Sequence, residues 1–240
     1  MIMKICIDPG HGGKDTGASK FNLHEKDVNL DIAKKLKQAL VDEGIQVQMT
    51  RDKDKSMSLS ERGQMINSSE FDFVVSVHNN SALSEDARGS EIIYPSNSQK
   101  GKELSQYILD ELGLTGLRKR KVYTRLNSSG EDYYYMIREI NPLSIIVECA
   151  FISNPYNNEF LKQEESRQRI ALAIKRGIIR YKEKYYSGIE EHWAMDSFKR
   201  LRDEKLVLNK HDLDDYVTWG EFATLVVRLL DRMDEINNDN

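Results

Sequence analysis

Three apolar runs in this 240-residue chain each lead to a side chain that can bind a metal or transfer a proton. The run 4–7 enters a Pro/Gly turn that contains His11, and two later runs end at His78 and Glu148. Short apolar runs of this kind are typical of buried strands. In an open α/β sheet, sites form at the edge where the parallel strands have their carboxyl ends. We therefore expect these three side chains to share one edge of a sheet.

Strand-like and helix-like segments alternate along most of the chain. In the first helix-like segment, Val28, Ile32, Leu36 and Leu40 recur at the spacing of one helix face. We predict strands at 4–7, 45–50, 71–77, 90–94 and 145–148, and helices at 26–43, 59–67, 101–112 and, as one or two helices, 157–185. This alternation predicts an α/β fold with a mostly parallel, twisted central sheet and helices on both faces.

The pattern is interrupted at residues 185–188, where we place the boundary between a domain at 1–185 and a smaller one at 186–240. The second domain is predicted to be a small α-helical module with one helix over about 192–206 and another over about 218–233. Thr218 and Glu221 have the spacing of a capping box, which favours a helix start at this point.

The composition narrows the classes of function. The net charge is −4, and the one basic run, Arg118 to Lys121, is interpreted as a solvated loop, so we expect no nucleic-acid partner. No apolar run approaches the roughly 18 residues that a membrane span needs, so none is predicted. The first residues lack the pattern of a signal peptide, and we expect synthesis in the cytoplasm. The two cysteines, Cys6 and Cys149, lie in apolar runs and are expected to be buried thiols.

His11, His78 and one carboxylate would form the two-histidine, one-acid ligand set of a catalytic zinc site. We choose Glu25 as the carboxylate, because it begins the first predicted helix shortly after His11. The rival ligands on spacing are Asp8, Asp15 and His24, and Asp8 is better suited to hold the turn or His11 in place. Glu148 is then left as the general base that takes a proton from a zinc-activated water and hands it to a leaving amine.

Five motifs occur in order between residues 3 and 183: Asp8-Pro9-Gly10-His11-Gly12-Gly13, Glu25, Thr50-Arg51-Asp52, Ser76-Val77-His78-Asn79-Asn80-Ser81 and Val147-Glu148-Cys149-Ala150-Phe151-Ile152-Ser153-Asn154-Pro155. In this order they resemble the zinc-dependent N-acetylmuramoyl-L-alanine amidases of the type 3 family. The resemblance implies Zn²⁺ held by His11, Glu25 and His78, with Glu148 as the catalytic carboxylate. It also implies hydrolysis of the amide between N-acetylmuramic acid and L-alanine in peptidoglycan. Asn80 and Arg138 are candidate substrate-binding residues, and a structural role is an equal alternative for each.

The segment with His192-Trp193-Ala194 and Thr218-Trp219-Gly220-Glu221-Phe222 is similar to one S-layer homology repeat. This resemblance implies that 186–240 binds a secondary cell-wall polymer. Self-association into a homo-oligomer, and a helical hairpin packed on the first domain, are the alternatives.

The sequence is compatible with three functional hypotheses. The first is a zinc amidase that lyses cell walls, either a phage endolysin or a mother-cell lytic enzyme, which acts on the wall after its release. The second is a catalytically inactive peptidoglycan-binding protein on the same fold. The third is a zinc peptidase that cuts a bond within the stem peptide.

Overall fold

The computed structural model describes residues 3–186, 200–201, 204, 206 and 218–238. The chain divides into two compact units, Met1–Tyr186 and Ser187–Asn240, and each is described by itself. None of the helices in these described residues is long and apolar enough to cross a membrane.

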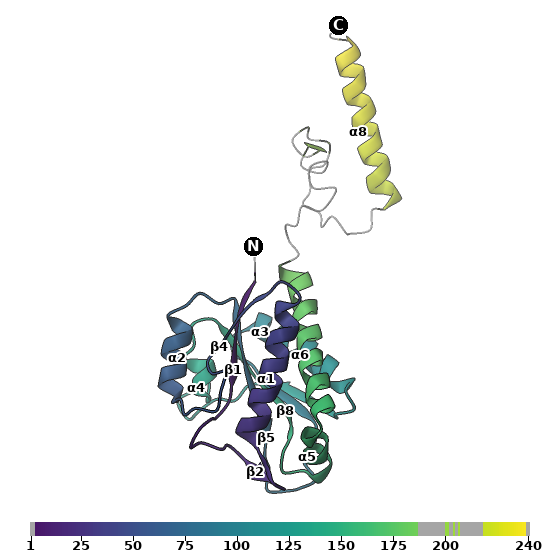
Figure 1. Ribbon diagram of the computed structural model, residues 1–240. Helices are drawn as coiled ribbons and strands as arrows, with labels where there is room; N and C mark the ends of the chain where they lie inside the picture. Colours follow the sequence, from purple (N-terminus) through teal and green to yellow (C-terminus); the bar gives the residue numbers. More distant parts are fainter. Residues whose placement is uncertain (1–2, 187–199, 202–203, 205, 207–217, 239–240) are drawn as a thin grey trace. The chain divides into compact units, whose positions relative to one another are not determined.

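A six-stranded sheet forms the centre of the first unit, with the strand order β4-β1-β5-β8-β6-β7 (Figure 1). Its strands are β1 (Lys4–Pro9), β4 (Gln46–Met49), β5 (Phe73–Asn80), β6 (Ser90–Ile93), β7 (Lys119–Tyr123) and β8 (Leu143–Phe151). All neighbouring pairs are parallel except β6 and β8, which are antiparallel. Two short strands, β2 (Ser19–Lys20) and β3 (Leu23–His24), form a separate antiparallel pair. The predicted α/β fold with a mostly parallel sheet is confirmed.

Helices cover both faces of the sheet (Figure 1). On one face lie α1 (Glu25–Val41), α3 (Gln99–Gly113) and α6 (Glu164–Tyr185), with α5 (Pro155–Lys162) beside α6. On the other face lie α2 (Leu59–Asn67) and α4 (Tyr135–Arg138), at the left in Figure 1. The segment 157–185, predicted as one or two helices, contains two, because Gln163 between them has an extended backbone.

The hydrophobic core has two parts, one on each face of the sheet, because successive side chains of a strand point to opposite faces. Ile7, Val77 and Val147 pack with the helices α1, α3 and α6, whereas Val74 and Ile146 pack with α2 and α4. Side chains two residues apart on a strand point to the same face. His78 of β5 and Glu148 of β8 are separated from Val74 and Ile146 by an even number of positions, so they face the side of α2 and α4.

The basic run 118–121 differs from its prediction. Lys119, Arg120 and Lys121 belong to β7, one of the two edge strands of the sheet, rather than to a solvated loop. Charged side chains on an edge strand discourage pairing with another chain, which reconciles the polar composition of this segment with strand structure. The run alternates too little in hydrophobicity to be recognised as a strand from the sequence.

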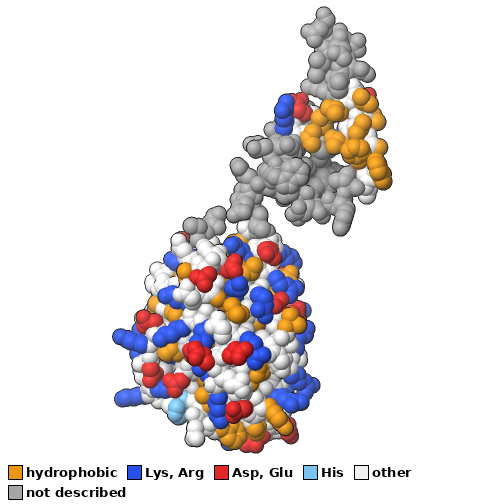
Figure 2. Space-filling model, turned by 45° about the vertical axis from the view of Figure 1, so that its right-hand side comes forward, with side chains coloured by type: hydrophobic (Ala, Val, Ile, Leu, Met, Phe, Trp, Pro, Cys, Tyr) orange, Lys and Arg blue, Asp and Glu red, His pale blue; other side chains and the backbone are white. Residues whose placement is uncertain are grey.

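In the second unit the described helix is α8 (Trp219–Asn238). Thr218 accepts a hydrogen bond from the Glu221 backbone N–H, and the Glu221 carboxylate accepts one from the Thr218 backbone N–H, so the predicted capping box forms. Hydrophobic side chains gather on the described part of this helix (Figure 2), and the exposed ones are Trp219, Phe222, Val226, Val227, Leu229 and Leu230. Most of the helix predicted at 192–206 lies outside the described residues, as do His192, Trp193 and Ala194.

Candidate metal centre

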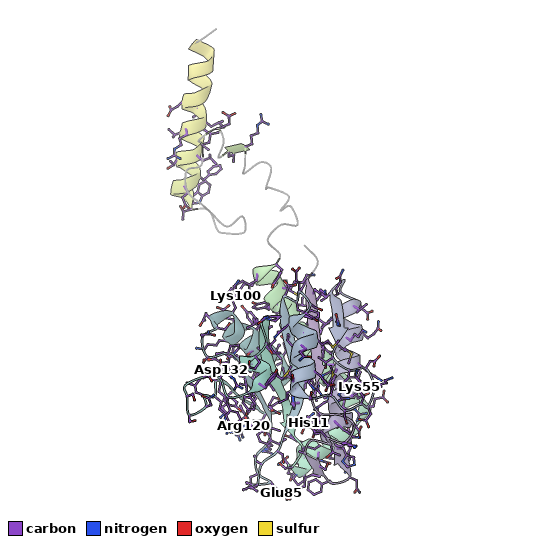
Figure 3. All side chains as sticks on the ribbon, turned by 90° about the vertical axis from the view of Figure 1, so that its left-hand side faces the viewer. His11, Lys55, Glu85, Lys100, Arg120 and Asp132 are labelled. Atoms are coloured by element: carbon purple, nitrogen blue, oxygen red, sulfur yellow. The ribbon has the colours of Figure 1, made fainter. Side chains whose placement is uncertain are left out.

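His11, Glu25 and His78 meet at the carboxyl edge of the sheet, and one ligand atom from each lies within 4.8 Å of the others. His11 Nε2 is 3.2 Å from Glu25 Oε2, and His78 Nδ1 is 3.0 Å from Glu25 Oε1. Figure 3 shows His11 at this end of the first unit. Three segments that are distant in sequence thus direct two imidazole nitrogens and one carboxylate to a single point.

Two contacts hold the backbone around His11. His11 itself has a positive φ of 61°, a conformation that is costly for a residue with a side chain. The Arg62 guanidinium donates to the carbonyl of His11 at 2.6 Å and to that of Pro9 at 2.8 Å. The same guanidinium forms a buried ion pair of 2.6 Å with Asp8, which is 1% exposed. Asp8 and Arg62 therefore hold the turn that carries His11. This agrees with the prediction that Asp8 holds the turn and is not a metal ligand.

A second buried guanidinium links the His11 turn to the first helix. Arg51, 1% exposed, donates to the carbonyls of Pro9 at 3.0 Å, Gly10 at 2.9 Å and Lys26 at 2.9 Å. Lys26 directly follows Glu25 in α1. Arg51 thus fixes the distance between two of the three segments that carry the cluster. The motif Thr50-Arg51-Asp52 of the family resemblance contains Arg51, but no local pattern assigned this role to Arg51 or to Arg62.

Glu25 begins α1 and is oriented by donors from three segments. Its Oε2 accepts from the Ala18 backbone N–H at 2.9 Å, and its Oε1 accepts from the Asn79 backbone N–H at 3.1 Å and from Asn29 Nδ2 at 3.2 Å. Burial disfavours the charged form, but hydrogen bonds with the two histidines outweigh it and hold the pKa of Glu25 well below its usual range. The carboxylate is therefore ionised, as a metal ligand must be.

The rival ligands have other partners. The Asp15 Oδ2 atom lies 2.9 Å from His11 Nδ1, on the side of the ring away from Glu25. A carboxylate in that position fixes the orientation and tautomer of a ligating imidazole. His24 is exposed, and its Nδ1 lies 2.8 Å from the Ser19 hydroxyl. Glu25 is the carboxylate that completes the cluster.

Glu148 lies in β8 directly opposite His78 of β5. Its Oε2 atom is buried and has no hydrogen-bond partner among the described residues. Burial raises the pKa of Glu148 to about 7, against the opposing attraction of His78. A buried carboxylate with a free oxygen and this pKa can accept and release a proton near neutral pH. Cys149 points to the opposite face, where it is buried in the core as predicted.

The two candidate substrate-binding residues lie in different surroundings. Asn80 ends β5 near the cluster, and its Nδ2 donates to Glu91 Oε2 at 3.2 Å. Arg138 in α4 donates to the carbonyls of Asp132 at 2.9 Å and Tyr133 at 3.1 Å, so it stabilises the loop before α4. No sequence motif indicates Glu91, although an acidic residue within a short apolar strand is a signal from which it could be predicted.

A cavity of about 420 Å³ opens beside His11 and His78 on the side of α2 and α4. Its lining includes the apolar side chains of Met57, Leu59 and Met136. The imidazoles are therefore accessible from a concave surface large enough for part of a substrate.

Comparison with known proteins agrees with this architecture. Residues 5–180 match the Amidase_3 family, described as N-acetylmuramoyl-L-alanine amidase. The germination-specific N-acetylmuramoyl-L-alanine amidase of Bacillus subtilis is 30% identical over 191 residues, which cover 74% of this chain and 78% of that protein. The N-acetylmuramoyl-L-alanine amidase LytC of Bacillus subtilis is 36% identical over 180 residues, which cover 74% of this chain and 35% of LytC.

Solved structures show the same fold. The N-acetylmuramoyl-L-alanine amidase AmiC2 of Nostoc punctiforme has a TM-score of 0.68 and 31% identity, over 75% of this chain and 96% of that one. Cwp6 from Clostridium difficile has a TM-score of 0.72 and 34% identity, over 75% of this chain and 29% of that one. The fold and the sequence similarity together define a peptidoglycan amidase. The chain belongs to the Amidase_3 family of N-acetylmuramoyl-L-alanine amidases.

Proposed function

We propose that this chain is a zinc-dependent amidase that hydrolyses the amide between the lactyl group of N-acetylmuramic acid and L-alanine. The observation that carries the proposal is the His11, Glu25 and His78 cluster beside the buried, unpartnered carboxylate oxygen of Glu148. A peptidoglycan-binding protein without activity would have no use for that oxygen, because burying an unpaired polar atom is costly.

The residues fit a zinc ion. Two imidazole nitrogens and one carboxylate form a three-ligand set that leaves a fourth position for water or substrate. Glu25 is ionised and oriented by backbone donors, and Asp15 lies at the far nitrogen of His11. These features match what holds zinc ligands in place in proteins.

When bound, zinc would supply Lewis-acid polarisation of the scissile carbonyl and activation of water. Glu148 then takes a proton from the attacking water through its free Oε2. The same carboxyl returns a proton to the leaving nitrogen of L-alanine. His11 and His78 are partly exposed to the adjacent cavity, which gives the acyl side of the substrate a place to bind.

The experiment that tests this function is digestion of purified peptidoglycan with the zinc-loaded chain, with new amino termini identified by mass spectrometry. We expect peptides that begin with L-alanine and a loss of activity when a chelator removes zinc. New termini at another residue would establish the peptidase alternative. A chain that binds peptidoglycan and releases no peptide would be a binding protein.

Replacement of Gly10 by alanine should weaken zinc binding. A Cβ atom at Gly10 would lie 2.1 Å from Cε1 of His78, so the imidazole has to move. We expect the zinc affinity, measured by competition with a chromogenic chelator, to fall about tenfold or more. The matched control is Gly220→Ala in α8, where the added Cβ meets its nearest atom at 3.9 Å. Equal zinc affinities of the two variants would contradict the assignment of His78.

The cellular role is proposed from the substrate. A phage endolysin and a mother-cell lytic enzyme both need a wall-cutting amidase, and in either case the enzyme acts on the wall after its release. The exposed apolar side chains of α8 support a contact surface in 186–240, for which a secondary cell-wall polymer or a second copy of the chain remains the predicted partner.

A further inference from the structure

A row of facing residues leads across the sheet from the metal cluster to its far edge. His78 of β5 is opposite Glu148 of β8, and Glu148 is opposite Glu91 of β6. Residues directly opposite each other on neighbouring strands project from the same face. Glu91 is thus the next side chain beyond Glu148 in the direction away from His78.

An irregularity in the next strand adds two cations to this row. Ser90 is opposite Lys119 and Glu91 is opposite Lys121, so Arg120 is an extra residue in β7. Extra residues of this kind redirect side chains and are frequent next to active sites. Arg120 Nε lies 2.7 Å from Glu91 Oε1, and Lys121 Nζ lies 4.0 Å from the same oxygen.

Arg120 is fixed on one side and open on the other. Its partner Glu91 is 4% exposed and accepts a second hydrogen bond from Asn80, and the guanidinium carbon lies 5.0 Å from the Phe151 ring centroid. Among the described residues, none accepts a hydrogen bond from Nη1 or Nη2 of Arg120, and its side chain is 31% exposed. Figure 3 shows Arg120 at the same end of the unit as His11. A guanidinium held in this way presents a fork of donors that matches a carboxylate.

The chemistry of the reaction decides which part of the substrate reaches Arg120. Glu148 returns a proton to the leaving nitrogen, so the peptide that begins at this nitrogen lies on the Glu148 side of the cluster. The cavity beside His11 and His78 lies on the other side, where the acyl part belongs. Strand spacing places β7 about 10 Å beyond β8, a distance that an extended peptide covers in about three residues.

We propose that Arg120, oriented by Glu91, binds a carboxylate of the stem peptide on the leaving-group side of the scissile amide. This proposal rests on the proposed amidase function and adds a preference for an acidic peptide. Glu91 acts as a positioning residue, since it holds the guanidinium and does not itself reach the carboxylate. Without the cation, Glu91 and Glu148 would repel an acidic peptide.

The test uses one peptidoglycan preparation with free stem-peptide carboxylates in two forms. Half is amidated with carbodiimide and ammonia, and half is mock-treated. Initial rates of release of L-alanine termini at limiting substrate are measured for the full-length wild type and for Arg120→Gln, Arg120→Lys and Lys119→Gln. The rate ratio of free to amidated substrate is the readout, because it cancels changes in folding or in Glu148 that affect both substrates equally.

We expect the wild type to cut the free form about tenfold faster or more. The rate ratio of free to amidated substrate should fall toward one in Arg120→Gln. In Arg120→Lys it should lie between one and the wild-type value, because lysine keeps a cation beside Glu91 but lacks the paired donors of a guanidinium. Lys119→Gln is the matched control, since Lys119 is also a cation of β7 and pairs with Asp110 of α3. Its ratio should equal that of the wild type.

Any other outcome would contradict either the amidase function, the carboxylate subsite or the role of Arg120. If the wild type cuts neither form, the proposed amidase function fails. If it cuts both forms equally, the function stands and the carboxylate subsite is wrong. A preserved ratio in both Arg120 variants excludes Arg120 as the contact. An equal loss of ratio in Lys119→Gln replaces the subsite with general attraction of polyanions by the basic edge strand.

Discussion

The variant Glu148→Gln will lower the rate of peptidoglycan cleavage about 10²–10⁴-fold, the usual contribution of a general acid–base group. Glutamine keeps the shape of the side chain but cannot take a proton from water. The buried Oε2 of Glu148 has no hydrogen-bond partner in the described part of the chain, so the substitution disrupts no contact of that atom. Release of L-alanine termini measures the rate, and chelator competition measures the zinc affinity, which we expect to stay within a few-fold of the wild type.

The matched control is Glu103→Gln. Glu103 lies on α3, where it pairs with Lys184 at 2.6 Å, and it has no contact with the cluster. We expect this variant to cleave at the rate of the wild type. If Glu148→Gln also retained that rate, another group would have to move the proton. If it lost zinc together with activity, Glu148 would be a part of the metal site rather than the base.

The variant Arg62→Leu will destabilise the first unit by about 3–5 kcal/mol, the typical cost of leaving one partner of a buried ion pair uncompensated. Asp8 is buried and would lose the 2.6 Å ion pair, although Thr50 and Ser76 still donate hydrogen bonds to it. The His11 carbonyl would lose its 2.6 Å hydrogen bond, so the zinc affinity should fall too. Urea unfolding of the metal-free chain, followed by far-ultraviolet circular dichroism, measures the stability.

Arg176→Leu is the comparison for this variant. Arg176 pairs with Glu111 at 2.7 Å on the surface, and its side chain is 45% exposed, so its loss should cost about 0–1 kcal/mol. Similar losses in the two variants would show that the Asp8–Arg62 pair has no special part in stabilising the turn. A large loss of stability in Arg62→Leu with unchanged zinc affinity would separate the fold of the turn from the geometry of His11.

The local sequence pattern was sufficient to predict the functional side chains at the ends of the central strands. His78 and Glu148 end short apolar runs, and His11 lies in the turn after another, while the carboxyl ends of parallel strands meet at one edge. The parity of residues along β8 likewise separates Glu148 from Cys149 without reference to neighbouring strands. These features could be predicted because they depend on residues adjacent in the sequence.

The sequence favoured Glu25 as the third ligand, but only the tertiary structure excludes its rivals. Asp15 and His24 have suitable chemistry and spacing, and their exclusion depends on contacts with His11 and Ser19. Ala18 and Asn29, which orient Glu25 from nearby in the sequence, are joined by the backbone N–H of Asn79, which lies 54 residues further along the chain in β5. No local pattern encodes such an arrangement.

By itself, the sequence determined the alternation of strands and helices, the positions of the two histidines and Glu148, and the membership of the amidase family. Only the tertiary structure decided that Glu91 lies next to Glu148 and that Arg120 faces it. The reason is physical: β6 runs antiparallel to β8, and an extra residue shifts the register of β7. Register depends on hydrogen bonds between strands, and a shift of one residue changes the face on which a side chain lies.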